Sequence, residues 1–273
     1  MAAKSAVKPI PEGFHTVTPY LIVEQANRLI DFLTQGLGAE EVSRTQGPDG
    51  TISNAEVRIS DSMLELADRT EQWKPRRGAI HLYVPDADAI YQRAMAAGGV
   101  SLEVPTDQSY GDREAGVKDP SGNQWWIATH KAAGPGNYVP AGLRSITAYL
   151  HVKGAAQMME FLKRAFEAQE ESCAKSPEGV VQHAKMQIGD SMVELSDAHG
   201  EFQPLTSAIH LYVPDTDAVY GRALGAGASS LIQPANQFYG DRAAGILDPF
   251  GIHWYIATRI DELSPEEIRS RAP

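Results

Sequence analysis

The side chains best suited to chemistry in this sequence are two repeated pairs of a glutamate and a histidine. Glu65 lies in the apolar stretch SMLELAD and His81 in AIHLYV, while Glu194 and His210 occupy the matching stretches SMVELSD and AIHLYV. A carboxylate beside an imidazole can act as a general base, or bind a divalent metal together with water. It can equally be a structural hydrogen bond, because burying a carboxylate without a partner is costly. Both interpretations stay open for both pairs.

These pairs recur because the chain contains the same sequence unit twice. Residues 17–130 align with residues 146–259 without a gap, and nearly half of the aligned positions are identical. A repeat of this length corresponds to one small domain and is much longer than a solenoid repeat. We therefore expect two domains, residues 14–130 and 143–260. Residues 131–142 between them are rich in Gly and Pro, which is typical of a linker.

Composition excludes several classes of function. The formal net charge is −11 without a Lys/Arg cluster, which argues against binding to nucleic acid or to anionic membranes. The sequence has a single cysteine, Cys173, so a disulfide framework is excluded and a cytoplasmic location is expected. Cys173 aligns with Arg44 in the first copy, which argues against a catalytic nucleophile. The sequence contains neither an apolar run long enough to span a membrane nor a signal-peptide pattern at its start.

Periodicity predicts the same elements in each copy. In the first copy, Thr18–Val23, Ser62–Asp68 and Ala79–Val84 are apolar and β-rich, as strands require. Ala26–Gly38 has helical spacing and ends at a glycine, and Asp86–Gly99 has Asp86 as its expected N-cap. With the remaining short alternating stretches, each copy is predicted to contain two βαβββ units and to belong to the α+β class.

The motifs in this order resemble the vicinal oxygen chelate superfamily, which includes glyoxalase I, bleomycin-resistance proteins and extradiol dioxygenases. The motifs are ELxD, HLYVPD and a closing DPxG turn followed by W and IAT, present in both copies. The tract QxYGDRxAGxxDPxG is most similar to the PhnB-like branch. The resemblance covers nearly the whole chain and implies two tandem glyoxalase-like domains, each with a curved mixed β-sheet around a cavity.

Single-copy members of this superfamily usually pair as homodimers. The resemblance therefore implies an internal pseudo-dimer, and a further homodimer of the whole chain is compatible with it. Whether the cavities form within one copy or between the two copies stays open.

The resemblance also implies four metal-ligand positions in each copy, of which only the glutamate is a credible ligand. Thr, Ala and Trp do not bind zinc, nickel or iron. We therefore expect no cofactor, with a divalent metal at the Glu–His pairs as the alternative. The four positions are occupied by Thr18, Glu65, Ala79 and Trp126 in the first copy and by Thr147, Glu194, Ala208 and Tyr255 in the second.

Other residues that recur at matching positions of the two copies are candidates for contacting a ligand. The aromatic candidates could stack on an apolar ligand or simply fill space, and the arginines could hold an anionic group or lock a turn. For Asp112 we favour a hydrogen bond within its turn. His15, His151, His183, His199 and His253 lack a counterpart in the other copy and are interpreted as incidental. The ligand-contact candidates are Tyr83, Arg113, Trp126, Tyr212, Arg242 and Tyr255.

Three hypotheses of function follow. The first is a glyoxalase/bleomycin-resistance-like protein that binds a small organic molecule without the full metal site of the superfamily. The second is a lyase, isomerase or dioxygenase of glyoxalase type, using Glu65, His81, Glu194 and His210 as bases or as a reduced metal site. The third is a structural or regulatory module without a ligand.

Overall fold

The computed structural model describes residues 7–131, 136–200 and 202–271. As the sequence predicts, each copy contains two βαβββ units. The first copy consists of β1 (Val17–Val23), α1 (Ala26–Gly36), β2 (Glu40–Gln46), β3 (Ile52–Ile59), β4 (Ser62–Asp68), β5 (Ala79–Tyr83), α2 (Ala87–Ala96), β6 (Val100–Asp107), β7 (Asp112–Lys118) and β8 (Gln124–His130).

The second copy repeats this order and is followed by one short helix. None of the helices in the described ranges is long and apolar enough to cross a membrane. The elements are β9 (Ile146–Val152), α3 (Ala155–Phe166), β10 (Gln169–Lys175), β11 (Val181–Ile188), β12 (Ser191–Asp197), β13 (Ala208–Tyr212), α4 (Thr216–Gly225), β14 (Ser229–Asn236), β15 (Asp241–Leu247), β16 (His253–Arg259) and α5 (Pro265–Arg271).

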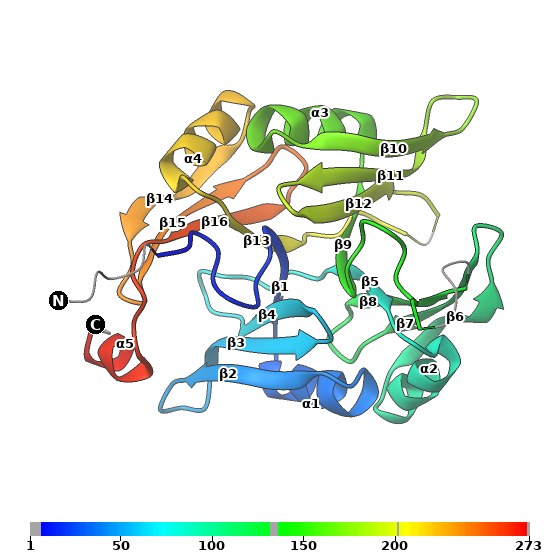
Figure 1. Cartoon of the computed structure of the whole chain (residues 1–273), viewed down its shortest axis with the longest axis horizontal. Coiled ribbons are helices and arrows are strands. Elements are labelled where there is room, and N and C mark those ends of the chain that lie inside the picture. Colours follow the sequence, from blue (N-terminus) through cyan, green and yellow to red (C-terminus); the bar gives the residue numbers. More distant parts are fainter. Residues whose placement is uncertain (1–6, 132–135, 201, 272–273) are drawn as a thin grey trace.

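The strands form two eight-stranded sheets, and each sheet takes one unit from each copy (Figure 1). One sheet has the order β14-β15-β16-β13-β1-β4-β3-β2, and the other β10-β11-β12-β9-β5-β8-β7-β6. The copies are joined by two antiparallel pairings, β1 with β13 and β5 with β9. The sequence leaves open whether cavities form within one copy or between the two copies. These pairings show that each curved sheet is completed between the copies.

The helices hold the two units of one copy together. α1 packs on α2 in the first copy and α3 packs on α4 in the second, on the outer sides of the sheets (Figure 1). The approach of α1 to α2 is close, since a Cβ at Gly36 would lie 3.2 Å from Cα of Ala94. Each copy thus has its own apolar core beneath its helices, while its sheet edges are completed by the other copy.

Each core is anchored by a fully buried tryptophan. Trp125 donates its indole N–H to Asp119 over 3.0 Å, and Trp254 donates to Asp248 over 2.9 Å. Both aspartates belong to the DPxG turns. Because a buried indole N–H needs an acceptor, these bonds fix the turn that leads into the last strand of each copy.

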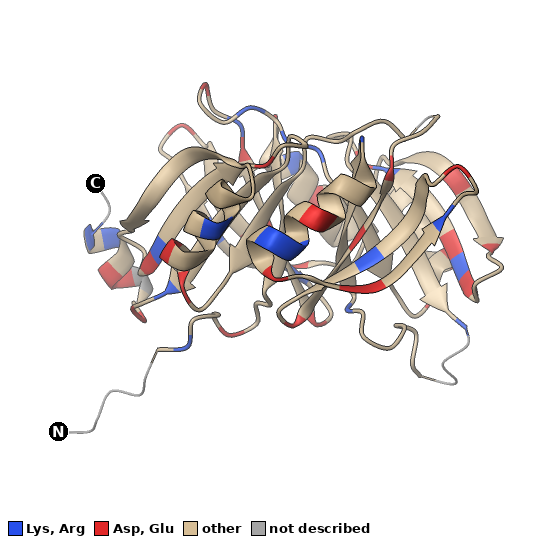
Figure 2. Ribbon diagram, turned by 90° about the horizontal axis from the view of Figure 1, so that it is seen from above, with Lys and Arg blue, Asp and Glu red and all other residues tan. Residues whose placement is uncertain are grey.

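Charged side chains of both signs are mixed over the molecule. Lys and Arg are interspersed with Asp and Glu over the helices and strands (Figure 2).

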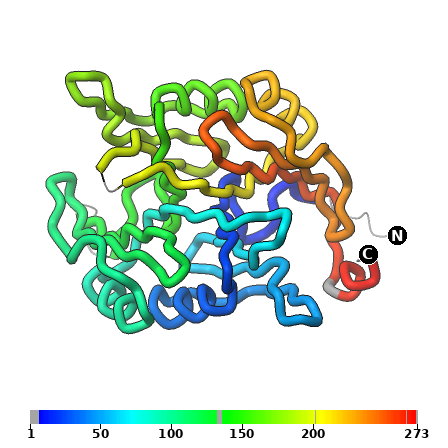
Figure 3. Tube along the Cα trace, turned by 180° about the vertical axis from the view of Figure 1, so that it is seen from behind, coloured from blue at the N-terminus to red at the C-terminus, as the bar shows by residue number. Residues whose placement is uncertain are grey.

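The two ends of the described chain lie on the same side of the molecule (Figure 3). The segment that precedes β1 and the segment that leads into α5 both lie against the β13–β16 unit (Figure 3). The N–H of Arg259 donates to the carbonyl of Pro9, and the N–H of Ile260 donates to that of Gly240.

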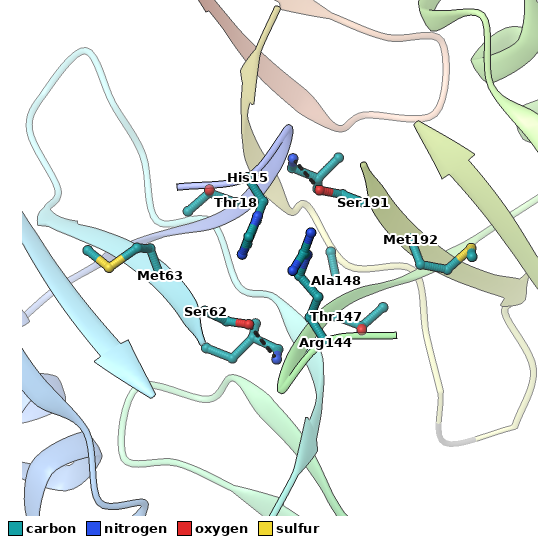
Figure 4. Close-up of a pocket in the computed structure, with 11 residues that line it drawn as sticks. His15, Thr18, Ser62, Met63, Arg144, Thr147, Ala148, Ser191 and Met192 are labelled. Carbon is teal, nitrogen blue, oxygen red and sulfur yellow. Dashed lines mark hydrogen bonds between the residues drawn. The ribbon is translucent and has the colours of Figure 1, made fainter. Parts of the chain in front are cut away.

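A reciprocal set of hydrogen bonds closes the centre of the molecule between the copies. Asp61 accepts from the backbone N–H of Ser145, and Asp190 accepts from that of Thr16, over 3.0 and 2.8 Å. His15 lies beside this centre, with Nδ1 3.0 Å from Asp190, and Arg144 enters it from the other copy (Figure 4). Burial alone would raise the pKa of Asp190, but the hydrogen bonds from Thr16 and its neighbours lower it to about 2.

This architecture predicts that one copy is not a stable monomer by itself. In an isolated fragment of residues 1–136, the edges of β1 and β5 would lack their partners, and exposed edges pair with other chains. We expect this fragment to retain its helix-covered core and to form a homodimer in which β1 pairs with β5 of the second molecule. Light scattering after size-exclusion chromatography measures this, with the intact chain as the mass reference. A monomer that unfolds cooperatively would contradict the prediction.

Candidate functional site

A cavity of about 700 Å³ lies on the face of the sheet formed by β5–β8 and β9–β12. We call it the His81 cavity. Its walls come from both copies, because β5, β7 and β8 supply one side and β9, β11 and β12 the other. The residues that carry most of its chemistry are His81, Tyr83, Tyr110, Asp112, Glu114, Trp126 and His130 of the first copy, and Tyr149, His151, His183, Glu194, His199 and Phe202 of the second.

His81 lies between two carboxylates, Glu194 of the second copy and Glu114 of its own copy, and neither is Glu65. Its Nδ1 is 2.9 Å from Glu194, and its Nε2 is 3.1 Å from a carboxylate oxygen of Glu114. Burial alone would lower the pKa of His81, but the negative charges of Glu194 and Glu114 raise it to about 10. The imidazole is therefore a cation at neutral pH, placed to donate protons and not to accept them.

Glu194 is almost fully buried and has several basic partners. Besides His81, it lies 3.3 Å from Nε2 of His183 and 3.8 Å from Nζ of Lys185. Burial alone would raise the pKa of this carboxyl, but the charge of His81 and the contacts with His183 hold it well below its usual range. Glu194 is thus an ionised carboxylate whose charge is matched within the protein.

The equivalent contact in the second sheet joins Glu65 to His210. A carboxylate oxygen of Glu65 accepts from Nδ1 of His210, so the partnership of Glu65 with His81 that a site within one copy would require does not occur. The strand pairings explain this, because β5 is joined to β9 and β13 to β1. Opposite Glu65 on β3 lies Glu56, whose pKa is raised by burial and by the charge of Glu65.

Asp112 has side-chain contacts in addition to the turn contact that the sequence suggests. Its side chain is buried, accepts from the hydroxyl of Tyr83 over 2.8 Å, and lies 2.5 Å from Nδ1 of His130. Asp241 repeats this arrangement with Tyr212 and Arg259, at 3.0 and 2.5 Å. The Tyr–Asp contact therefore lies beside the Glu–His pair in both sheets, and in the His81 sheet it orders the cavity wall. The turn contact is also present, because the backbone carbonyl of Asp112 accepts from the N–H of Gln108 over 2.7 Å.

Three histidines interpreted as incidental line the His81 cavity: His151, His183 and His199. His151 is buried, with Nδ1 3.1 Å from Oγ of Ser196, and burial lowers its pKa to about 4. It is therefore a neutral imidazole at physiological pH. Its Nε2 is also buried and has no hydrogen-bond partner among the described residues.

Aromatic rings form much of the remaining wall. Trp126 and His151 both contact Phe202, at ring-centroid distances of 5.5 and 5.6 Å. A Cβ at Gly116 would lie 2.8 Å from the Trp126 ring, so only glycine leaves space for the indole on the neighbouring strand. Within the described chain, Nε1 of Trp126 is buried and without an acceptor.

The matching region of the other sheet has diverged. Trp73, at the position of Phe202, contacts Tyr255 with ring centroids 5.8 Å apart, and Tyr255 also contacts Tyr20 at 5.3 Å. The substitutions between aligned positions change both charge and donor capacity. Glu114, Trp126, His130, His151, His183 and Lys185 align with Ala243, Tyr255, Arg259, Ile22, Asn54 and Glu56.

The two arginine candidates have carboxylate partners of their own. Arg113 donates to both oxygens of Asp88, and Arg242 does the same to Asp217. Such bidentate contacts occupy the guanidinium donors that would hold a ligand carboxylate. Neither arginine belongs to the lining of the His81 cavity, so their role as ligand contacts stays a prediction.

Comparison with known proteins assigns the family. The family model described as "Glyoxalase/Bleomycin resistance protein/Dioxygenase superfamily" matches residues 13–127. An uncharacterised protein of Mycobacterium bovis is 35% identical over 120 residues, which are 40% of this chain and 79% of that protein. The chain belongs to the glyoxalase/bleomycin resistance protein/dioxygenase superfamily.

Solved structures of this superfamily share the fold. A glyoxalase I mutant from Zea mays superimposes with a TM-score of 0.67 at 17% identity, covering 89% of this chain and 94% of that one. A putative dioxygenase from Bacillus subtilis gives a TM-score of 0.59 at 14% identity, covering 95% and 89%. These identities support the two-domain fold alone and carry no activity over to this chain.

The metal positions of the superfamily do not fit a metal in this chain. In the His81 sheet they are Thr147, Glu194, Ala79 and Trp126. Alanine offers no ligand atom, and the indole nitrogen is a donor without a free lone pair. Glu194 is already paired with His81. One carboxylate is therefore the sole good ligand of the four, which is too few to hold a metal ion.

The Glu194–His81 pair predicts a pH-dependent stability. The pKa of His81 is about 10 in the folded protein against 6.5 for a free histidine. Its contribution is therefore complete below about pH 6.5 and declines as the pH rises toward 10. We expect Glu194→Gln to lower the free energy of unfolding by about 3 kcal/mol near pH 6, and by less at pH 9.

Denaturant unfolding at pH 6 and pH 9 measures this difference. Glu71→Gln, at an exposed position, is the control and should change stability little at either pH. An effect of Glu194→Gln that is equal at both pH values, or larger at pH 9, would show that the pair is not an ion pair.

Proposed function

We propose that this protein binds a small organic molecule in the His81 cavity, without the metal site of its superfamily. The proposal rests chiefly on the cavity, whose volume of about 700 Å³ lies within the range of small-molecule sites, roughly 300–1,000 Å³. Its wall combines aromatic rings with a few polar groups, as such sites usually do. The side chains of Trp126 and Phe202 provide apolar ring surface for stacking.

The charged groups of the wall are largely matched by one another before a ligand arrives. Glu194 is held by His81, and Asp112 by Tyr83 and His130. Hydrogen bonds of this kind keep the side chains in one arrangement, so binding costs little reorganisation. Preorganised walls of this type support ligand binding or a reaction of the bound molecule.

Blocking the cavity should abolish binding of an uncharged apolar dye. Ala174 is exposed on β10 and lines the cavity, so Ala174→Trp places a large ring in the cavity without disturbing the core. We expect Nile red fluorescence to rise on binding to the unchanged protein, and the affinity to fall at least tenfold in Ala174→Trp.

The matched control is Thr45→Trp, because Thr45 is the aligned and equally exposed residue in the other copy. This variant should bind the dye as the unchanged protein does. Equal loss in both variants, or no loss in either, would place the dye elsewhere and contradict the proposal.

A second candidate function is metal-dependent or Glu/His-based lyase, isomerase or dioxygenase chemistry in the same cavity. It is favoured by one observation, since His81, Asp112 and Glu114 offer ligand atoms that all lie within 4.8 Å of one another. Metal binding there would have to displace the proton of His81, which is held firmly by two carboxylates.

Metal analysis of protein purified without a metal-affinity tag separates the two candidates. We expect less than 0.1 equivalent of zinc, iron, nickel or manganese per chain, and no saturable binding of Zn²⁺ by calorimetry at pH 7. A stoichiometric ion that is lost in Glu114→Gln would favour the second candidate. Ala243 stands at the matching position of the other copy, so such a site would hold one ion per chain.

A further inference from the structure

Four carboxylates line the His81 cavity, and its basic side chains are unevenly distributed among them. Three basic side chains gather around Glu194, and His130 contacts Asp112. The other two carboxylates are Glu103 and Glu114. They therefore receive a smaller share of the positive charge than the two carboxylates that face them across the wall.

The partners of Glu103 and Glu114 are mostly uncharged. Glu103 accepts from the side-chain amide of Gln108, and Glu114 accepts from the hydroxyl of Tyr110, each over 3.2 Å. Glu114 also lies 3.1 Å from Nε2 of His81, which is shared with another carboxylate. Among the described residues, Glu103 has no cationic partner. Negative charge is therefore in excess at this part of the wall.

The fold does not require these two carboxylates. Glu103 aligns with Ile232 and Glu114 with Ala243 in the second copy, which forms the same strands without them. Asp112 and Glu194, in contrast, have counterparts in both copies. Burying a carboxylate is costly, and Glu114 is only 8% exposed. A charge that is costly and is not needed by the sheet indicates a role in binding.

Aromatic rings adjoin the same part of the wall. A Cβ at Gly116 would lie 2.8 Å from the Trp126 ring and 3.2 Å from the backbone nitrogen of Glu103, so the ring and β6 meet over this glycine. Glu114 is two residues before Gly116 on β7 and faces the same side of the sheet. The ring of Tyr110, which is bonded to Glu114, is 59% exposed. Aromatic faces beside carboxylates favour a positively charged organic group, because the face of a ring attracts a cation.

We infer that the His81 cavity binds an organic cation, with its charged nitrogen beside Glu103 and Glu114 and its apolar part against the rings of Trp126 and Tyr110. This inference rests on the ligand-binding function proposed above and adds the chemical class of the ligand. An organic anion would bring a further negative charge to these carboxylates, which is unfavourable. An uncharged molecule would use the rings and leave the carboxylates unbalanced.

The other sheet provides an internal comparison. Its rings are present, since Trp73 contacts Tyr255 with centroids 5.8 Å apart. Its matching positions for the acidic pair are occupied by the apolar residues Ile232 and Ala243. Rings without carboxylates lack the charge that would hold a cation. We therefore assign the cation site to the His81 sheet, with one ligand per chain.

The test compares three naphthalene probes of similar size and different charge: 1-naphthylmethylammonium, 1-naphthalenemethanol and 1-naphthylacetate. Their affinities for the full-length protein are measured by equilibrium dialysis in about 0.15 M salt, which screens the general attraction of cations to an acidic chain. Glu103→Gln keeps the shape of the side chain and removes one charge from the cavity. Glu71→Gln removes one charge at an exposed position outside the lining of the cavity and is the matched control.

We expect the unchanged protein to bind the ammonium probe about tenfold more tightly than the alcohol, and the acetate more weakly than the alcohol, with one molecule per chain. The ratio of the ammonium affinity to the alcohol affinity should fall about fivefold in Glu103→Gln and stay unchanged in Glu71→Gln. Taking this ratio cancels any loss of packing in a variant. Ala174→Trp, which fills the cavity, should abolish binding of the ammonium probe.

An alcohol or acetate that binds as tightly as the ammonium probe would overturn the cation inference while leaving the binding of small organic molecules intact. A preference that falls equally in Glu103→Gln and Glu71→Gln would also overturn it, because the attraction would then come from the charge of the whole chain. Absence of binding by all three probes has the same consequence, and the Nile red experiment then decides separately whether the cavity binds any organic molecule.

Discussion

The structure depends on two antiparallel strand pairings, β1 with β13 and β5 with β9. They decide that each sheet is shared between the copies, and hence which glutamate meets which histidine. His81 on β5 is brought to Glu194 through β9 and β12, and His210 on β13 to Glu65 through β1 and β4. Because these ion pairs cross from one copy to the other, they stabilise the association of the copies, and the His81–Glu194 pair also forms part of the wall of the His81 cavity.

This arrangement changes how the similarity of the copies is to be interpreted. The features kept in both are the Glu–His pair, the Tyr–Asp contact and the core tryptophan with its aspartate. Each of them joins strands or orders a turn, which both sheets require. The features that differ, among them Glu114, His151 and Lys185, lie in the wall of one cavity. Duplication thus preserves the framework of the sheets and allows the chemistry of the cavity to diverge.

The sequence predicted the elements well because their signals are local. Apolar periodicity gave the strands and helices to within a few residues, and Asp86 caps α2 through the N–H of Ala89 as expected. The partners of Glu65 and His81 could not be predicted, because no local signal tells whether β5 pairs within its copy or with the other. The side-chain partners of Asp112 could not be predicted for the same reason, since Tyr83 and His130 lie on separate strands. His151, His183 and His199 occur in one copy only, so comparison of the copies gives no signal for them, although residues that differ between copies can confer specificity in a duplicated protein.

The loss of the metal positions has a physical explanation in the same strand pairings. A metal site needs several oxygen or nitrogen lone pairs directed at one point. In the His81 sheet, Ala79 offers no ligand atom and the indole of Trp126 offers only an N–H. Glu194, the one good ligand at these positions, is paired with His81, which balances its charge as a bound cation would. The same carboxylate thus joins the two copies, because its partner comes from the other copy through β9 and β5.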